Sequence, residues 1–270
     1  MSEGTKKPFS PLILGIVGAS RLADRRYPEA VWACGGVELR ADGLPIDGVL
    51  PAIEGFAAEQ VRREFRGPVV FTLRLQRDGG AWENSRAKER EAVWCALASR
   101  SHRVCDIVDV EIEEAASLSS EMWKLLRASG LKVMLSHHAF SIEAPHVWEE
   151  QLGVMRAYHP DAVKFAISVK DTAMAGDLLR FGKHVAEEFP LSCVIGMGEN
   201  GAVTRVASPL LGCPITYAFL EEGPVAPGQL PLKVLQSVFA KSAMRPKPED
   251  SAEKWIAWVE NELAEISRAV

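Results

Sequence analysis

A single lysine, Lys164, stands inside the apolar run 162–167 (AVKFAI), which is typical of a buried strand. Burial disfavours a charged ammonium, because little water remains to solvate it. A lysine held as the neutral amine can attack a carbonyl carbon and form a Schiff base. The alternative is a lysine at a strand end that reaches solvent or pairs with a carboxylate. Its charged neighbours therefore decide how Lys164 is interpreted.

Charged side chains also occur late in other strand-like segments. In the segment 36–42 (GVELRAD), the period of two places Glu38 and Arg40 on one face, with Asp42 beyond them. A carboxylate and a guanidinium that enter a protein interior are costly unless they are paired or functional. The remaining candidates near strand ends are Arg74, Asp78, His137, His138 and Arg205.

Repeated strand and helix patterns predict how these residues are positioned. The predicted strands are 12–19, 36–42, 68–76, 105–113, 131–140, 162–168, 191–198 and 214–220. The predicted helices are 54–65, 85–101, 121–129, 145–158, 172–188 and 230–243. Eight strands with intervening helices in about 250 residues favour a (β/α)8 TIM barrel over an open doubly wound sheet. The carboxyl ends of barrel strands form active sites, so we expect the charged residues to meet at one mouth.

A proline-containing break at 246–250 separates the predicted barrel domain, residues 1–245, from an extension, residues 246–270. Helical spacing in 253–269 gathers apolar side chains on one face. These side chains are Trp255, Trp258, Val259, Leu263 and Ile266. We expect an added C-terminal amphipathic helix, which either braces the barrel or forms the subunit contact of a homodimer.

Composition narrows the class of protein. The 270 residues are 47% hydrophobic with a net charge of −5, which suits a soluble protein with a large core. No apolar run approaches the roughly 20 residues that span a membrane, and residues 1–7 lack a signal-peptide layout, so we expect a cytoplasmic protein. No long basic cluster indicates nucleic acid or a membrane as a partner. The five cysteines lack a CxxC pair and are expected to be reduced core residues.

Together, these stretches resemble the type I 3-dehydroquinate dehydratase family, the Schiff-base dehydroquinases of the shikimate pathway of aromatic amino acid biosynthesis. The matching stretches follow the family order over nearly the whole chain up to about residue 243. They are 37–42 (VELRAD), 71–74 (FTLR), 78–80 (DGG), 136–140 (SHHAF), 163–166 (VKFA), 197–201 (MGENG), 204–205 (TR), 214–217 (PITY) and 226–229 (APGQ). Each stretch is weak alone, and together they are specific.

The resemblance implies a lyase mechanism. Lys164 would form an imine with the C3 ketone of 3-dehydroquinate, which acidifies the adjacent C2 proton. His138 would remove that proton and then protonate the departing C1 hydroxyl, giving 3-dehydroshikimate by syn elimination. Asp78 would support His138, although the family commonly has the longer Glu at this position.

The resemblance also implies how the substrate is held. Arg205 would bind the substrate carboxylate, while Glu38, Arg40 and Arg74 would bind ring hydroxyls. Gln229 would contact the substrate from a closing loop. No metal and no organic cofactor is implied.

The resemblance leaves one choice to explain, between His137 and His138, and two positions depart from the usual family residues. His137 and His138 are strand neighbours, so only one can face the barrel, and alternation alone leaves the choice open. The family motif selects His138, which makes His137 a packing or hydrogen-bonding residue. Ala139 replaces a usual Asp, and Val225 replaces a Ser whose hydroxyl is worth about 1 kcal/mol in a typical hydrogen bond.

Three other functions fit the sequence less well. The run 196–201 (GMGENG), with Glu221 about 20 residues later, formally matches a dinucleotide fingerprint. Pro209, Gly212 and Pro214 leave little room for the helix that such a site needs, so we expect the glycines to shape a tight loop instead. The remaining alternatives are another Schiff-base barrel enzyme, such as an aldolase, and a non-catalytic barrel that binds a shikimate-like ligand.

Overall fold

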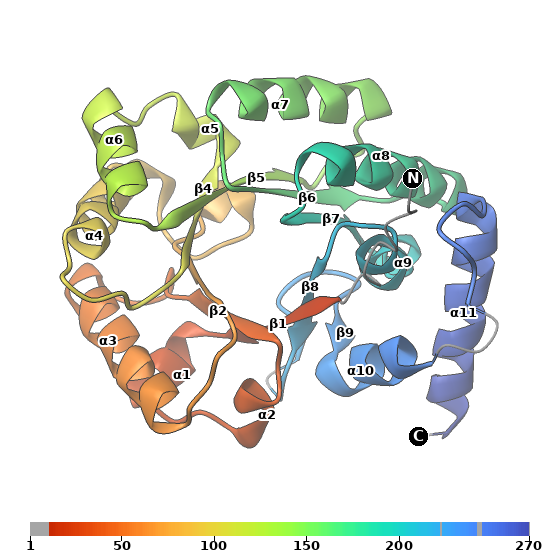
Figure 1. Ribbon diagram of the computed structural model, residues 1–270, viewed down its shortest axis with the longest axis horizontal. Coiled ribbons are helices and arrows are strands. Elements are labelled where there is room, and N and C mark those ends of the chain that lie inside the picture. Colours follow the sequence, from red (N-terminus) through yellow and green to blue (C-terminus); the bar gives the residue numbers. More distant parts are fainter. Residues whose placement is uncertain (1–10, 222, 242–244, 270) are drawn as a thin grey trace, which may run out of the picture.

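The computed structural model describes residues 11–221, 223–241 and 245–269. Parallel strands curl into a barrel with helices on its outside (Figure 1), in the order β7-β6-β5-β4-β3-β2-β1-β8-β9. The strands are β1 (Leu12–Val17), β2 (Gly36–Arg40), β3 (Val69–Thr72), β4 (Ile107–Glu111), β5 (Lys132–Ala139), β6 (Ala162–Ser168), β7 (Ser192–Met197), β8 (Ile215–Phe219) and β9 (Leu230–Pro231). The predicted (β/α)8 barrel is confirmed, and all eight predicted strands are present.

The helices follow the predicted alternation. They are α1 (Ala19–Asp24), α2 (Glu29–Trp32), α3 (Ile46–Arg62), α4 (Glu89–Ala98), α5 (Ile112–Ala115), α6 (Ser120–Ala128), α7 (Pro145–Ala157), α8 (Thr172–Glu188), α9 (Thr204–Leu210), α10 (Leu232–Ala240) and α11 (Ala252–Ala269). Helix α3 begins well before its predicted start, because Pro45 serves as its N-cap and Pro51 is accepted inside it. The short helices α1, α2, α5 and α9 were not predicted, since so few turns carry little periodicity.

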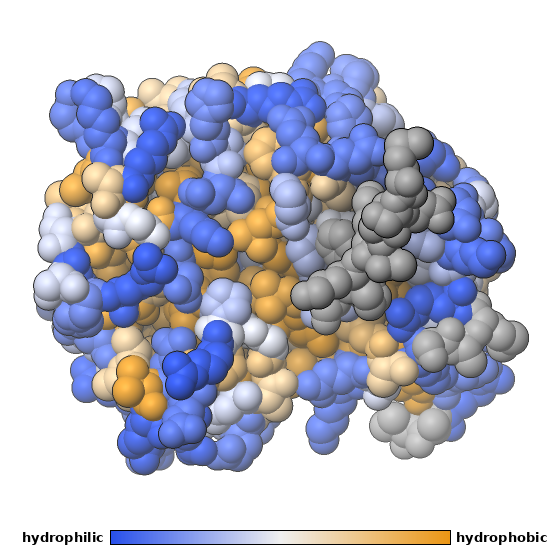
Figure 2. All heavy atoms as spheres, in the orientation of Figure 1, coloured by the Kyte–Doolittle hydropathy of each residue, from blue (hydrophilic) through white to orange (hydrophobic). Residues whose placement is uncertain are grey.

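Two apolar layers lie on opposite sides of the strands. The inner layer fills the barrel with alternate residues such as Leu14, Val70 and Met134. The outer layer packs the strands against the helices. Figure 2 shows hydrophobic residues gathered near the middle of the viewed face and hydrophilic residues on the surrounding helices. The period-two alternation therefore assigns each strand residue to the barrel interior or to the helix interface.

Helix α11 packs along α8, α9 and α10 on one side of the barrel (Figure 1). Its residues Trp255, Trp258 and Val259 are buried within the chain. This arrangement fits the expected brace, while a subunit contact stays a prediction. The predicted end of the preceding helix at 242–243 lies outside the described residues, and α10 ends at Ala240.

Several expectations from composition meet the structure here. Among the helices of the described residues, none is long and apolar enough to cross a membrane. Residues 1–7, on which the signal-peptide argument rested, lie outside the described residues. The cysteines are unpaired, and four are buried as expected, but Cys95 is exposed on α4 and is not a core residue.

Candidate active site

One cavity of about 560 Å³ opens at the carboxyl ends of the strands and collects every site residue predicted from the sequence. Its lining includes Glu38, Arg40, Arg74, Asp78, His138, Lys164, Arg205 and Gln229. The apolar side chains Ile16, Ile195 and Met197 complete part of the wall. The barrel thus brings residues that are up to 191 positions apart, Glu38 and Gln229, into one site.

Strand alternation explains why these side chains converge. His138 shares the inner face of β5 with Met134 and Ser136, whereas His137 shares the outer face with Leu135. In the parallel register, Ser136 lies opposite Lys164 on β6. The structure therefore places His138 in the cavity and leaves His137 outside it.

Lys164 is buried, with 5% of its surface exposed, but it is not surrounded by apolar groups alone. Its Nζ atom lies 3.4 Å from Oε1 of Glu38 and 3.4 Å from Oδ2 of Asp109. The same atom lies 4.2 Å from the ring centre of Tyr217, within reach of a cation–π interaction. The lysine is therefore buried in a strand, as the apolar run predicts, and also paired with carboxylates, as the alternative allowed, while its use as a nucleophile stays a prediction.

Asp109 is the main site residue that sequence reasoning missed. Its Oδ2 accepts a hydrogen bond from Arg74 at 2.6 Å, and its Oδ1 accepts one from Ser136 at 2.6 Å. Burial raises the pKa of Asp109, but the charges of Arg74 and Lys164 outweigh burial and lower it to about 2. The period of two on β4 could have found it, since Asp109 alternates with apolar residues and points inward with Ile107.

His138 lines the cavity as a buried imidazole. Burial, and then the positive charges of Arg74, Lys164 and Arg40, lower its pKa well below the usual value, so it is neutral near pH 7. Its Nδ1 atom is buried and has no hydrogen-bond partner among the described residues. A neutral imidazole in this position suits a general base.

His137 has a different environment. Its Nδ1 lies 3.0 Å from Oε1 of Glu113, and its Nε2 lies 3.1 Å from Oε2 of Glu143. Burial lowers the pKa of His137, but its hydrogen bonds to the two glutamates outweigh burial and raise it. Both ring nitrogens are thus used on the outside of the barrel, which confirms the expectation of a hydrogen-bonding residue.

Asp78 lines the cavity at the end of η1 (Gln76–Asp78) and is 8% exposed. Burial, and then the negative charges of Glu111 and Glu113, raise its pKa to about 6. Within the described residues, no hydrogen bond joins Asp78 to His138. The expectation that the shorter acid reaches less far toward His138 is consistent with this geometry.

Arg205 is an unusual buried cation. It is 1% exposed, and no carboxylate of the described residues lies within ion-pairing distance of it. Its Nη2 donates to the carbonyl oxygen of Pro227 at 3.2 Å, and its Nε has no partner within the described part of the chain. Burial lowers the pKa of Arg205 to about 10, so it is still charged at neutral pH. A buried, unpaired guanidinium favours an anionic ligand.

The opposite wall carries Glu38 and Arg40 on β2. Oε1 of Glu38 accepts a hydrogen bond from Oγ1 of Thr72 at 2.9 Å. Arg40 makes two hydrogen bonds to the carboxylate of Asp42, at 2.8 and 3.0 Å. Glu38 is thus paired with Lys164 and Arg40 with Asp42, which lies beyond the end of β2 as predicted and is buried.

Residues 225–229, which we call the covering segment, follow β8, border the cavity and contact the end of β7. Gly198 N donates to Pro227 O at 3.2 Å, and a Cβ on Gly228 would lie 2.2 Å from the Gly198 carbonyl oxygen. Oε1 of Gln229 accepts a hydrogen bond from Val225 N at 2.9 Å, so the side-chain oxygen of Gln229 is held by the backbone of the same segment. Gly228 also has a φ of 74°, so glycine is required at this position for two reasons.

The glycine run after β7 has a structural function. A Cβ on Gly196 would lie 2.6 Å from the Cα of Gly201, so the two backbones meet directly. The run leads into η3 (Glu199–Gly201) and the short helix α9, which carries Arg205 and includes Pro209. Pro209, Gly212 and Pro214 were expected to leave little room for a helix, and α9 is indeed short, with 7 residues.

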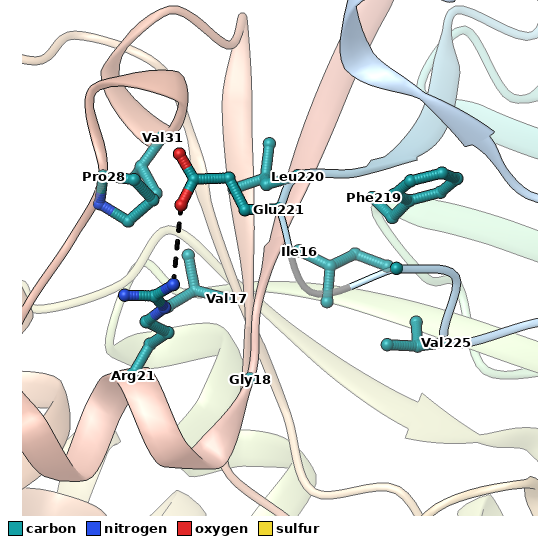
Figure 3. Close-up of a pocket in the computed structure, with 11 residues that line it drawn as sticks. Ile16, Val17, Gly18, Arg21, Pro28, Val31, Phe219, Leu220, Glu221 and Val225 are labelled. Atoms are coloured by element: carbon teal, nitrogen blue, oxygen red, sulfur yellow. Dashed lines mark ion pairs between the residues drawn. The ribbon is translucent and has the colours of Figure 1, made fainter.

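A second cavity of about 390 Å³ adjoins the first and shares Ile16 and Val225 with it (Figure 3). Val17, Val31 and Leu220 line it, and the ion pair between Arg21 and Glu221, 3.5 Å apart, lies among its lining residues.

Across the described residues, no group of three or more His, Cys, Asp or Glu side chains is arranged to hold a metal ion.

Comparisons with known proteins show the family and the fold that this chain resembles. A model of the type I 3-dehydroquinase family matches residues 19–246. A 3-dehydroquinate dehydratase of Methanosarcina acetivorans is 29% identical over 204 residues, which cover 75% of this chain and 83% of that protein. One from Pyrobaculum aerophilum is 32% identical over 225 residues, or 82% of this chain and 68% of that protein. The crystal structure of 3-dehydroquinate dehydratase from Geobacillus kaustophilus has the same fold, with a TM-score of 0.68, 21% identity and coverage of 88% and 91%.

Proposed function

The chain belongs to the type I 3-dehydroquinase family, and we propose that it converts 3-dehydroquinate to 3-dehydroshikimate and water through an imine on Lys164. The observation that carries this proposal is the convergence of three groups on one cavity: the amine of Lys164, the neutral imidazole of His138 and the guanidinium of Arg205, which has no carboxylate partner in the described chain. A substrate with a ketone, an acidic adjacent proton and a carboxylate suits this set.

The first step joins substrate and protein. The amine of Lys164 attacks the C3 ketone, and loss of water with uptake of one proton, which is released again when the imine is hydrolysed, gives a protonated imine. The carboxylates of Glu38 and Asp109, each 3.4 Å from Nζ, stabilise its positive charge. The imine draws electrons from C2, so the C2 proton becomes acidic enough for a neutral base.

The second step is elimination. His138 takes the C2 proton, and the electron pair moves through the imine and forms the C1–C2 double bond as the C1 hydroxyl departs. His138 returns its proton to the departing oxygen, so one water leaves and the imidazole is neutral again. Hydrolysis of the imine consumes one water, restores Lys164 and releases 3-dehydroshikimate. The water formed with the imine balances the water used in its hydrolysis.

Binding falls to the charged residues around the cavity. Arg205 holds the carboxylate, and it is the cavity arginine without a carboxylate partner in the described chain. Arg40, Glu38 and Arg74 orient the ring hydroxyls from paired positions, which keep their side chains fixed. Gln229 contacts the substrate from the covering segment.

Formation of the enone product tests the proposed function. Purified protein is mixed with 3-dehydroquinate, and ultraviolet absorbance of the conjugated product is followed with Lys164→Ala as the comparison. We expect absorbance to rise with the wild type and to stay flat with the variant. A folded wild-type protein that forms a lysine adduct without enone would favour another Schiff-base reaction, and one that forms neither would favour a non-catalytic barrel.

A further inference from the structure

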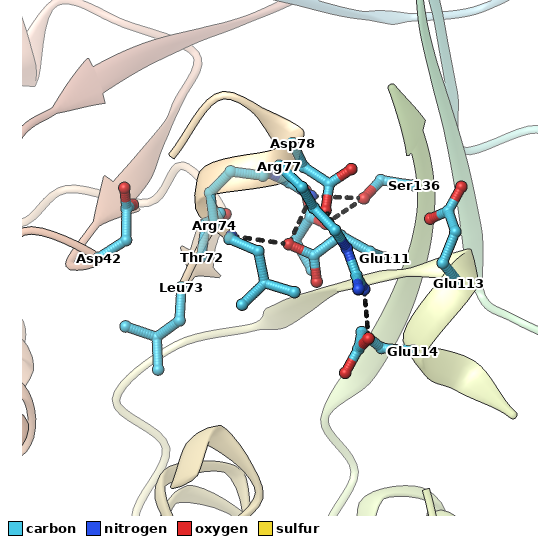
Figure 4. A network of polar contacts seen from close by, with 12 residues as sticks. Asp42, Thr72, Leu73, Arg74, Arg77, Asp78, Glu111, Glu113, Glu114 and Ser136 are labelled. Atoms are coloured by element: carbon cyan, nitrogen blue, oxygen red, sulfur yellow. Dashed lines mark hydrogen bonds and ion pairs between the residues drawn. The ribbon is translucent and has the colours of Figure 1, made fainter. Parts of the chain in front are cut away.

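A line of buried charges runs from the outside of the barrel to Lys164. Its members alternate in sign and are Arg90, Glu111, Arg74, Asp109 and Lys164. Successive partners lie 2.6, 3.2, 2.6 and 3.4 Å apart. None of these side chains is more than 7% exposed, so water screens the charges little. Figure 4 shows the middle of this line, where Arg74 lies beside Glu111 and Ser136.

Arg90 is the outermost member and does not line the cavity. It lies in the first turn of α4 and is fully buried between that helix and the strands. Its Nη1 donates to Leu73 O at 2.8 Å and to Oε2 of Glu111 at 2.6 Å. Its guanidinium also lies 5.1 Å from the ring centre of Trp94, which fixes its orientation.

The distances show how the charges divide into pairs. Glu111 lies 2.6 Å from Arg90 but 3.2 Å from Arg74. Arg74 in turn lies 2.6 Å from Asp109. Each buried acid therefore has one arginine at 2.6 Å, and Glu111 has Arg74 as a second, more distant partner. Arg90 also lies 3.4 Å from Oε2 of Glu114, a partly buried carboxylate.

This division matters for the lysine. If Arg90 lost its charge, Glu111 would draw Arg74 away from Asp109. The less neutralised Asp109 would then hold the ammonium of Lys164 more strongly, and an ammonium has no electron pair with which to attack a carbonyl. The charge of Arg90 thus reaches Lys164 through three intermediate side chains.

We propose that Arg90 is a positioning residue that sets the reactivity of Lys164 through Glu111, Arg74 and Asp109. The proposal rests on the proposed function for the use of Lys164 as a nucleophile. It predicts opposite changes in the reactivity of Lys164 for substitutions at the two neighbouring residues Arg90 and Glu111. Arg90→Met should lower the reactivity of Lys164. Glu111→Gln should raise it, because Arg74 then has Asp109 as its one remaining carboxylate partner among the described residues. General damage to the fold would lower both.

Competitive acetylation measures this reactivity without any substrate. Trace acetic anhydride is added to the folded protein, and peptide mass spectrometry compares acetylation of Lys164 with that of Lys170, which is 61% exposed and serves as the internal reference. Since couplings in buried networks change equilibria by roughly threefold to a hundredfold, we expect Lys164 labelling to fall at least about threefold in Arg90→Met. Arg90→Lys should restore most of it.

Arg86→Met is the matched control. Arg86 also pairs with a glutamate, Glu89 at 2.7 Å, and lies 5.0 Å from the ring centre of a tryptophan, Trp82, but it is 35% exposed and outside the line of charges. We expect Lys164 labelling in this variant to match the wild type.

Equal Lys164 labelling in all folded variants, or a fall in both Arg90→Met and Glu111→Gln, would overturn the proposal. If Arg90→Met does not fold by circular dichroism, the comparison of Glu111→Gln with the wild type still tests it, and labelling that does not rise contradicts it. Turnover of 3-dehydroquinate by the wild type is measured in parallel. Its absence would count against the proposed function, while the labelling result would still decide the role of Arg90.

Discussion

The guanidinium of Arg205 donates a 3.2 Å hydrogen bond to the carbonyl oxygen of Pro227. The same oxygen accepts a hydrogen bond from the backbone of Gly198, at the end of β7. The carbonyl of Pro227, in the covering segment, thus joins the proposed carboxylate-binding arginine to the end of β7. Substrate binding and the position of this segment are therefore expected to depend on each other.

Arg205→Met is expected to weaken substrate binding while sparing the free protein. Loss of one partner from a buried charge pair costs about 2–5 kcal/mol, which predicts a KM increase of roughly 30-fold or more. The free protein should keep its stability or gain some, because a buried cation without a carboxylate partner in the described chain is removed. Steady-state kinetics and urea denaturation measure the two effects. A KM within about threefold of wild type would contradict the binding role.

Gly228→Ala is expected to displace the covering segment. Its new Cβ would lie 2.2 Å from the Gly198 carbonyl oxygen, in addition to the strain of a φ of 74°. Gly223→Ala is the matched control, because Gly223 has a φ of 84° but, in the described part of the chain, no atom lies within 4 Å of its added Cβ. We expect KM to rise in Gly228→Ala well beyond its change in Gly223→Ala. Equal effects in the two variants would mean that backbone strain alone matters.

The two neighbouring histidines are expected to differ sharply on substitution. His138→Ala should lower kcat by about 10²–10⁴, the usual contribution of a general acid–base group. His137→Ala should keep most of the turnover, because both nitrogens of His137 are bonded to Glu113 and Glu143 outside the cavity. His137→Ala should instead lower the thermal stability of the protein, because these two hydrogen bonds are lost. Equal losses of kcat in the two variants would refute the assignment of the base to His138.

Asp78 is expected to make stability depend on pH. The fold raises the pKa of Asp78 from 3.8 to about 6, chiefly through burial, so the folded protein binds this proton more tightly than the unfolded chain. Its contribution to stability is full below about pH 4 and is lost as the pH rises through about 6. Asp78→Asn cannot ionise, so its urea midpoint relative to wild type should improve between pH 4 and pH 7. A difference that does not change with pH would contradict the raised pKa.

Much of this site could be predicted because a strand has a period of two. Glu38 and Arg40 follow from alternation on one strand, and Arg74 and Lys164 from their places in or just after strand-like segments whose carboxyl ends meet in a barrel. The family motif, rather than the alternation, chose His138 over His137, and the inner apolar layer of the structure gives the physical reason.

The pairing of buried charges could not be predicted in this way. Asp109 and Arg90 lie on different elements, and only the three-dimensional fold shows that Arg74 connects them through Glu111. Similarly, the need for glycine at 228 depends on the carbonyl of Gly198, 30 residues earlier. Sequence patterns report the face on which a side chain lies, but not which partner from another element it meets.

The imine on Lys164 is the central claim, and trapping it with borohydride is its most direct test. Wild type and Lys164→Ala are incubated with 3-dehydroquinate and sodium borohydride, and intact mass and peptide mapping are recorded. We expect a reduced adduct of the substrate or product on the wild type that maps to Lys164, and none on the variant. A wild-type protein that turns over the substrate without a trapped adduct, or with an adduct on another lysine, would contradict the account.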